Sequence, residues 1–391
     1  MKFDVHYEAQ RIFRPHPHGM DVVAMRVLDE LLAHDEIDKI VVYTSGRPVP
    51  GRMTLDHPKL DWRCMRPMPY PVFEQIELPL AIRRSTRRGA ASVHHFTSNT
   101  APLALPRPAV ITIHDVIYMA DSTELSGSAS AYQRYGRYYR RFIVPRVAHK
   151  AERIVTVSHY EKDNLTRALN LDPARVCVAH NGVSSIFFDP VNEHELRELL
   201  DKLGIERPYI LFLANTDPKK NTGRTLRSFL AARKAAGFPH RLVMTDLPAH
   251  YWATLKRAVG TEGWDALCPL PFIPPHDLRA LYAGASLYLY PSLVESFGLP
   301  LLEAMAAGAP VISSDTSAIP EIAGQHALLV NPRDEKALTA AIMDLIARPP
   351  SRSTLEAARR HAAEFTWART ASAVVSAYKS ALAACARGGS A

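Results

Sequence analysis

The chain has 391 residues, of which 47% are hydrophobic and 22% are charged. This composition excludes an intrinsically disordered chain, and the length favours two domains of about 150 to 200 residues each. The formal net charge of +8 at pH 7 predicts anionic partners, namely nucleic acid, an acidic membrane surface or phosphorylated small molecules.

The amino-terminal residues and the cysteines bear on the cellular compartment. Residues 1–10 lack the apolar core of a secretory signal, and no segment approaches the roughly 18 apolar residues of a membrane span. The four cysteines are scattered without a CxxC pair, which argues against a disulfide framework or a zinc site. We therefore expect a cytoplasmic protein, with peripheral attachment to the inner face of the cytoplasmic membrane as an open alternative.

The first half of the chain predicts parallel βα units. Short apolar strands are expected at residues 37–44, 109–115 and 152–158, with helical segments between them. Because these apolar runs are too continuous for a sheet with one solvated face, we expect helices on both faces.

Two clusters of basic residues lie in this half. Arg83, Arg84, Arg87 and Arg88 follow an apolar stretch, and five arginines between residues 134 and 146 alternate with tyrosines and a phenylalanine. This pattern is typical of a helix that faces lipid headgroups. It is equally compatible with a solvated basic helix whose aromatic side chains turn into the core.

A second series of βα units begins near residue 209. Its later strands are expected at residues 240–246, 285–291, 310–315 and 327–332, and helices follow from residue 351. We therefore predict an α/β protein with two doubly wound, Rossmann-like domains separated by a cleft. The predicted boundaries are 1–190 for the first domain, 191–365 for the second, and 366–391 for a final helix that returns to the first.

The most informative stretch is residues 291–315, which predicts a strand, a loop, a helix and a second strand. Pro300 suits the first turn of the helix, and Gly308 suits its end. The backbone amides of Phe297, Gly298 and Leu299 are expected at the amino end of the helix. That position favours a bound anion.

Glu295 and Glu303 bracket this anion site, with seven residues between them. A carboxylate accepts hydrogen bonds from paired hydroxyls, so one glutamate can hold a ribose and the other a transferable sugar, with a diphosphate between them. In the alternative interpretation, both glutamates only stabilise the start of the helix, where acidic side chains are favourable.

A basic turn follows the first strand of the second domain, at residues 218–221. Open α/β sheets bind ligands at this edge, and Lys220 would neutralise the charge that develops on a departing diphosphate. The sequence has no Asp-x-Asp pair and no His/Cys cluster with metal-ligand spacing, and it lacks the glycine-rich nicotinamide and ATP motifs. We therefore expect no metal and no resident cofactor.

Together these segments resemble the GT-B glycosyltransferases of family GT4, retaining enzymes that build bacterial polysaccharides, lipopolysaccharide and glycolipids. The signature is the EX7E motif at residues 295–303, followed by family-like segments at 304–315 and 319–332. The segments at 114–116, 158–165, 180–187 and 217–221, and the helix that starts at Gly19, resemble the family's upstream motifs in the same order.

This resemblance implies a role for each site residue. Glu303 would hold the donor ribose, Glu295 the donor sugar hydroxyls and Lys220 the diphosphate, while His114 would lie beside the donor sugar. The implied catalytic residues are His114, Glu295 and Lys220. The implied donor-binding residues are Gly19, Asn215, Thr216, Lys220, Ile273, Ser296, Phe297, Gly298, Leu299 and Glu303.

The resemblance also implies the reaction. A hexose, mannose by preference, would pass from a nucleotide diphosphate sugar to a glycan or lipid-linked acceptor, with GDP preferred to UDP. Configuration would be retained by front-face displacement, without a protein nucleophile or a metal. The sequence departs from the family where Asn215, Thr216 and Asp246 replace glycine, arginine and glycine. Lys219 or Arg224 then becomes the candidate for a second cationic contact.

Two other functions fit part of the pattern. A nucleotide-sugar epimerase shares this architecture and acts without an acceptor. A basic protein that binds nucleic acid or membrane without catalysis explains the charge, but it leaves residues 295–303 without a role.

Overall fold

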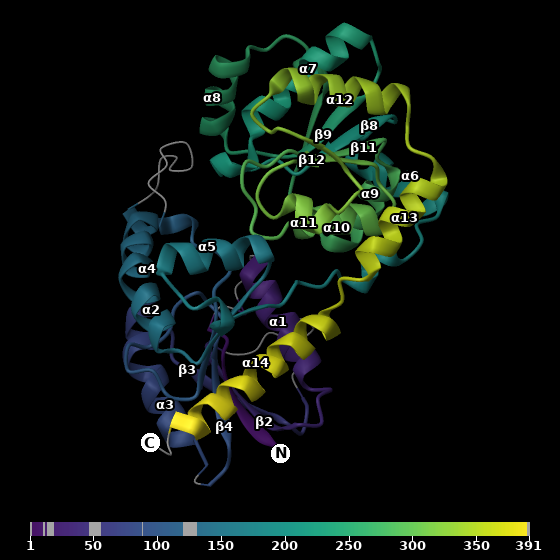
Figure 1. The fold of residues 1–391 in the computed structure, drawn as a ribbon. Helices are drawn as coiled ribbons and strands as arrows, with labels where there is room; N and C mark the ends of the chain where they lie inside the picture. The colour runs from purple at the N-terminus through teal and green to yellow at the C-terminus, as the bar shows by residue number, and fades with distance from the viewer. Residues whose placement is uncertain are drawn as a thin grey trace. The chain divides into compact units, whose positions relative to one another are not determined.

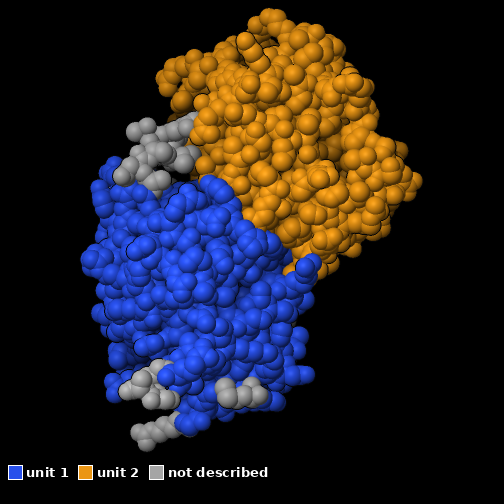
Figure 2. All heavy atoms as spheres, in the orientation of Figure 1, with its two compact units in different colours: residues 1–121, 128–182, 367–391 blue, residues 122–127, 183–366 orange. Residues whose placement is uncertain are grey.

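The computed structural model describes residues 2–10, 12–13, 19–46, 56–87, 89–119 and 131–388. Two compact units make up this part of the chain (Figure 2). Described residues up to 182 and those from 367 onward form the first unit, and residues 183–366 form the second. The sequence prediction placed these two divisions at 190 and 365.

The first unit is built on a parallel sheet (Figure 1). This sheet has seven strands in the order β3-β2-β1-β4-β5-β6-β7. Its strands are β1 Phe3–Glu8, β2 Ile37–Ser45, β3 Leu60–Met65, β4 Ser92–Phe96, β5 Ala109–Thr112, β6 Arg153–Thr156 and β7 Val176–Val178. The central strands are buried along their length, as expected for a sheet covered on both faces.

Helices cover both faces of this sheet. They are α1 Gly19–Leu31, α2 Tyr70–Val72, α3 Leu78–Ser85, α4 Ala131–Lys150, α5 His159–Leu169 and α14 Trp367–Gly388, with a π-helical turn at Phe73–Glu77 between α2 and α3. Helices α1 and α14 pack together on one face. On the other face, α3, α4 and α5 share an apolar core with the strands.

The second unit is built on a six-stranded parallel sheet in the order β10-β9-β8-β11-β12-β13. Its strands are β8 Tyr209–Phe212, β9 Arg241–Thr245, β10 Leu267–Leu270, β11 Leu287–Tyr290, β12 Val311–Ser314 and β13 Leu328–Val330. The strand order reverses between β8 and β11, so the carboxyl ends of these two strands lie next to each other at the centre of the sheet.

The helices of the second unit also lie on both faces of its sheet. They are α6 Glu193–Leu203, α7 Thr222–Ala236, α8 Ala249–Val259, α9 Pro275–Gly284, α10 Leu299–Ala306, α11 Ile319–Ala323, α12 Glu335–Ala347 and α13 Arg352–Ala363. Helices α7 and α12 pack against one face and share an apolar core with β8, β9 and β11. Helix α10 contacts β11 and β12 and packs against α9 and α13.

The predicted strands of both units lie where the structure has them, but several are shorter than predicted. Strand β5 ends at Thr112 rather than at residue 115, and β6 ends at Thr156 rather than at residue 158. The sequence prediction did not name the central strands β1 and β4 or the edge strands β3, β7 and β10. Strand β3 is only partly buried and β7 has three residues, so neither shows a long apolar run.

No helix in the described part of the chain is both long enough and apolar enough to cross a membrane.

Candidate active site

The predicted donor site of the second unit lies where the strand order reverses. Lys220 is in the loop after β8, and Glu295 is in the loop after β11, its hydrogen-bonded neighbour. Ligands of open α/β sheets bind beyond the carboxyl ends of strands at such a reversal. The fold therefore brings together two charged residues that are 75 positions apart in sequence.

The turn before α7 has a defined geometry that orients Lys220. Residues Pro218–Lys220 form a 3₁₀ turn, whose start is capped by the Asp217 carboxylate accepting a hydrogen bond from the Lys219 amide (3.1 Å). Asn221 then adopts a left-handed conformation (φ 59°). Its side-chain amide donates to the carbonyls of Pro291 (3.0 Å) and Pro332 (2.7 Å), which ties the turn to the loops after β11 and β13.

Lys220 and Glu295 form a close ion pair within this site. The Lys220 Nζ lies 2.5 Å from Glu295 Oε1 and 3.4 Å from the Tyr290 hydroxyl, and it also faces the Tyr290 ring. Both side chains are largely buried, with 22% and 10% of their surface exposed. Burial alone would raise the pKa of Glu295, but the Lys220 and Lys219 charges and the hydrogen bonds from Lys220 and Ser292 outweigh it and lower the pKa.

The backbone of Glu295 is held by the residues that precede α11. Its amide donates to Ser317 Oγ (3.0 Å), and its carbonyl accepts from the Ala318 amide (3.2 Å). Ser317 has a positive φ of 59°, which turns the chain just before α11. The loop that carries Glu295 is therefore held at both main-chain groups.

Helix α10 starts at Gly298, between the two glutamates. This glycine is the N-cap residue, and no side chain of the described residues caps the helix. Its φ of 108° is accessible to glycine but strained for other residues, and a Cβ at this position would lie 2.9 Å from Ile319 Cδ1. Backbone amides at such a helix start attract an anion through the helix dipole. The nearby Lys220 adds a full positive charge.

Glu303 lies in the middle of α10 and has a different environment from Glu295. Its side chain is partly exposed but closely surrounded by protein, and this desolvation raises its pKa to about 7. Among the described residues no cation forms an ion pair with it. Its charge is instead felt by three buried tyrosines, Tyr282, Tyr288 and Tyr290.

The remaining predicted residues of the second unit lie at the same edge of the sheet. Asn215 and Thr216 are exposed in the loop after β8, where the Asn215 side chain accepts from the Asp217 amide (2.9 Å). Ser296 is partly buried beside Phe297, and Ile273 is partly exposed in the loop after the edge strand β10. Ile273 follows β10, which is separated from β8 by β9 in the sheet.

The candidates for a second cation differ in their partners. The Lys219 Nζ lies 3.8 Å from Asp217, in the same turn. Arg224, in the first turn of α7, donates to Asn221 Oδ1 (3.3 Å) and lies 4.0 Å from Glu335 of α12. Asp246, which replaces a family glycine, accepts from the Trp252 indole (2.9 Å) and thereby connects β9 to α8.

His114 and Gly19 belong to the first unit. His114 is buried beyond the end of β5, where its Nε2 donates to the Thr97 carbonyl (3.1 Å) and its backbone amide donates to Asn99 Oδ1 (2.7 Å). Burial lowers the pKa of His114, so the imidazole is neutral and keeps Nδ1 as an acceptor. Gly19 is exposed at the first position of α1, where an added Cβ would have open space around it.

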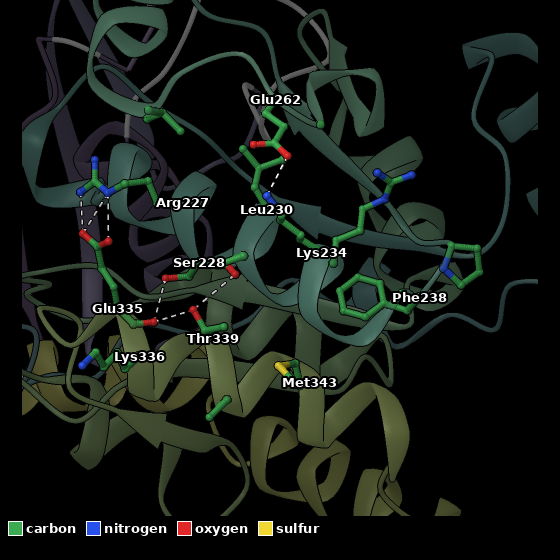
Figure 3. A pocket seen from close by; sticks show the side chains of 17 residues that line it. Arg227, Ser228, Leu230, Lys234, Phe238, Glu262, Glu335, Lys336, Thr339 and Met343 are labelled. Atoms are coloured by element: carbon green, nitrogen blue, oxygen red, sulfur yellow. Dashed lines mark hydrogen bonds and ion pairs between the residues drawn. The ribbon is translucent and has the colours of Figure 1, made fainter.

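A cavity of about 990 Å³ opens elsewhere on the second unit, between α7 and α12 (Figure 3). Two ion pairs join side chains that line it: Arg227 with Glu335 (2.5 Å) and Lys234 with Glu262 (2.8 Å). None of the described residues that line it belongs to the predicted donor site. The predicted donor site at the ends of β8 and β11 is therefore separate from this cavity.

Sequence reasoning missed three residues that shape this site: Asn221, Tyr290 and Ser317. Asn221 crosslinks three loops, Tyr290 contacts Lys220, and Ser317 holds the Glu295 amide. The position of Tyr290 at the very end of an apolar strand is a usable signal. The other two roles depend on positive φ values that the sequence does not reveal.

Family models match most of the chain. The model described as "Glycosyltransferase Family 4" covers residues 17–185, and the model described as "Glycosyl transferases group 1" covers residues 178–362. The chain belongs to the GT4 glycosyltransferases that these two models together describe. The second model includes the whole of the Lys220, Glu295 and Glu303 site.

Curated relatives are similar over much of their length. The chain is 29% identical to O-antigen chain mannosyltransferase B of Escherichia coli, over 59% of this chain and 61% of the relative. It is 28% identical to O-antigen chain mannosyltransferase RfbU of Salmonella typhimurium, over 72% and 71%. It is also 28% identical to MMP alpha-(1->4)-mannosyltransferase of Mycolicibacterium hassiacum, over 95% and 89%.

Solved structures show that the fold is GT-B. Sucrose-phosphate synthase from Thermosynechococcus elongatus superposes with a TM-score of 0.70 at 18% identity, covering 98% of this chain and 100% of that one. Anabaena Alr3699/HepE, solved in complex with UDP and glucose, superposes with a TM-score of 0.68 at 14% identity, covering 96% and 98%. The predicted fold class is therefore confirmed.

Proposed function

We propose that this glycosyltransferase transfers a hexose, mannose by preference, from a nucleotide diphosphate sugar to a glycan or lipid-linked acceptor in cell-surface polysaccharide synthesis. The observation that carries the proposal is the cluster of Lys220, Glu295 and the start of α10 at the adjoining ends of β8 and β11. The mannosyltransferase names of the relatives support the sugar and the polysaccharide context.

The cluster suggests how the donor binds. Lys220 and the amides of residues 297–299 hold the diphosphate, since both carry positive charge toward one point. Glu295 accepts hydrogen bonds from the donor sugar hydroxyls, and its low pKa keeps it ionised for that task. Glu303 accepts hydrogen bonds from the ribose.

The same groups lower the barrier to sugar transfer. When the bond between the sugar and the diphosphate breaks, negative charge accumulates on the leaving group, and Lys220 with the helix dipole stabilises it more strongly than in the ground state. We propose that these charges replace a metal ion and that the leaving phosphate oxygen accepts the proton of the incoming hydroxyl on the same face. The anomeric configuration would then be retained.

His114 contributes from the first unit. A neutral imidazole with Nε2–H donated to Thr97 presents Nδ1 as an acceptor, which suits a sugar hydroxyl rather than a phosphate. We propose this role for His114 and a place near the phosphates for Gly19.

A thermal-shift panel tests the proposal. GDP-mannose, UDP-glucose and dTDP-glucose are each added with Mg²⁺ and with EDTA. We expect one base, GDP by preference, to raise the melting temperature equally in both conditions, and Glu303→Ala to lose most of the shift. Glu356→Ala, on the exposed face of α13, is the matched control. Equal shifts in wild type and Glu303→Ala would remove Glu303 from the donor site, and a shift that requires Mg²⁺ would contradict metal independence.

We further propose that the first unit attaches to an anionic membrane through one surface. Six large apolar side chains lie 41% to 68% exposed on two segments, 70–85 and α4; they are Val72, Ile76, Leu80, Tyr135, Tyr138 and Phe142. The two segments pack together where the Tyr139 hydroxyl donates to Glu74 (2.6 Å). Exposed Arg83, Arg84, Arg134 and Arg146 lie on the same two segments. Apolar side chains with arginines around them suit lipid headgroups.

One part of the predicted basic cluster does not fit this role. Arg87 pairs with Asp4 (2.6 Å) and Asp38 (2.8 Å) within its own unit, so its charge is already compensated. Arg88 lies outside the described residues.

Vesicle flotation tests the membrane proposal. Wild type is expected to float with vesicles that contain phosphatidylglycerol but not with pure phosphatidylcholine, and Arg83→Ser/Arg84→Ser and Tyr138→Ser/Phe142→Ser are each expected to sink. Lys256→Ser/Arg257→Ser, on the exposed side of α8, removes two positive charges as well and is the charge-matched control for the arginine pair. Wild type that fails to float, or variants that float as well as the control, would contradict it.

A further inference from the structure

Phe365 occupies the point where the chain leaves the second unit. It lies two positions before α14, which belongs to the first unit. Its carbonyl accepts a hydrogen bond from the amide of Val183 (2.8 Å), the residue at which the described part of the chain enters the second unit. One hydrogen bond therefore joins the segment that enters the second unit near Val183 to the segment that leaves it after Phe365.

These segments are also joined within the first unit. The Thr370 hydroxyl, at the start of α14, donates to the carbonyl of His180 (2.6 Å). The segments around residues 180–183 and 365–370 are thus hydrogen-bonded to each other within each unit. The Phe365 ring also contacts the loop of residues 295–298 before α10, which we call the donor loop.

The ring of Phe365 packs edge-on against the ring of Phe297, with 6.0 Å between centroids and 72° between planes. Phe297 is buried and directly precedes Gly298, so its side chain fixes the start of α10. The Phe365 ring also contacts the His361 ring, with 5.3 Å between centroids, and His361 Nε2 donates to the Ile322 carbonyl of α11 (2.8 Å).

Helix α11 supports the same loop from a second direction. Its first residue, Ile319, brings Cδ1 to 2.9 Å from the position of a Cβ on Gly298, and the residues before it hold the Glu295 backbone. Phe365 contacts the loop at Phe297, and His361 contacts both Phe365 and α11. These two side chains therefore link Phe297 to α11.

We propose that Phe365 is a positioning residue for the donor site. Its ring orients Phe297 so that the amides of residues 297–299 point at the donor diphosphate, and its main-chain carbonyl holds the amide of Val183. The role rests on the proposed function, in which these amides bind the diphosphate. Because a displacement of about 1 Å at a binding group lowers activity strongly, loss of the ring contact should weaken donor binding specifically.

Steady-state kinetics test this role in Phe365→Leu, with GDP-mannose and UDP-glucose as parallel donor probes. We expect the donor KM to rise about tenfold while the acceptor KM stays within about twofold. Phe365→Tyr keeps the ring and should restore the donor KM. Phe238→Leu is the control, because Phe238 packs in the α7 core against Phe229 and His240, away from the donor loop.

Amide hydrogen exchange of the free proteins gives a second readout that needs no ligand. We expect the amides of residues 296–299 to exchange about tenfold faster in Phe365→Leu than in wild type, and at the wild-type rate in Phe238→Leu. If Phe365→Leu matches Phe238→Leu in both measurements, the positioning role is overturned. If Glu303→Ala also leaves the donor KM unchanged, the proposed donor site fails instead, and the exchange result alone decides whether Phe365 supports the loop.

Discussion

The two ends of the EX7E motif differ sharply, although each carries the same residue. At the loop end, Glu295 is buried against Lys220, and the lysine charge keeps its pKa low despite the burial. At the helix end, Glu303 has no ion-pair partner among the described residues, and desolvation raises its pKa to about 7. One glutamate is a fixed anion, whereas the other titrates near neutral pH.

This difference shows that the spacing of a motif does not set the chemistry of its members. The pairing of Glu295 depends on the adjacency of β8 and β11, which brings Lys220 from a distant part of the chain. Glu303 projects from α10, where the neighbouring Tyr282 and Tyr288 are buried and neutral. The two carboxylates are therefore suited to different hydroxyl groups of one donor.

Replacing Lys220 by methionine should have the largest effect, because it removes the cation that distinguishes the Glu295 end. We expect kcat to fall about 10²- to 10³-fold, since the leaving diphosphate loses its fixed positive charge. The turnover at saturating donor measures this change, with Lys202→Met on exposed α6 as the control. A kcat within about threefold of wild type would contradict the role of Lys220.

Gly298→Ala tests the backbone that separates the two carboxylates. Alanine would be strained at φ 108° and would meet Ile319 Cδ1, so we expect a loss of about 2 to 3 kcal/mol in the free energy of unfolding by urea titration. Gly308→Ala has a similar positive φ (84°) but no atom within 4 Å, and should lose only about 1 to 2 kcal/mol. Equal losses would show that the Ile319 contact does not restrain the loop.

A pH titration of donor binding tests whether the protonation of Glu303 weakens donor affinity. Protonated Glu303 is a poorer acceptor for two hydroxyls, and the raised pKa means that the proton is bound below about pH 7. We therefore expect the donor Kd, measured by calorimetry, to rise up to about tenfold per pH unit below that value.

Glu303→Gln supplies the control for this titration. Its donor affinity should be weak but independent of pH between about 5.5 and 8, because Glu295 with its low pKa stays ionised in that range. A pH dependence that persists in Glu303→Gln would assign the titration to another group.

Ser317→Ala should have the smallest effect, confined to the Glu295 end. It removes the acceptor of the Glu295 amide, which costs about 1 kcal/mol of stability in urea unfolding. Ser372→Ala removes an exposed hydroxyl on α14 and should stay within about 0.5 kcal/mol of wild type. No difference between the two variants would mean that the Ser317 contact does not hold the loop.

The sequence predicted the parallel architecture and the helix that starts at Gly298, because apolar runs, glycines and prolines act locally. It placed Lys220 and Glu295 in one site only through a general rule about sheet edges. It did not predict that they form an ion pair, that Asn221 ties the loops together or that Ser317 holds Glu295, since each depends on strand order or on a positive φ. The burial of His114 against Thr97 likewise follows from packing of the first unit.

A crystal structure of the protein with bound GDP or UDP would show where the donor diphosphate lies. We expect the diphosphate to lie at the start of α10, contacted by Lys220 and the amides of residues 297–299, with Glu303 at the ribose. A nucleotide bound elsewhere, with Lys220 still paired to Glu295 and the helix start filled by protein atoms, would contradict it.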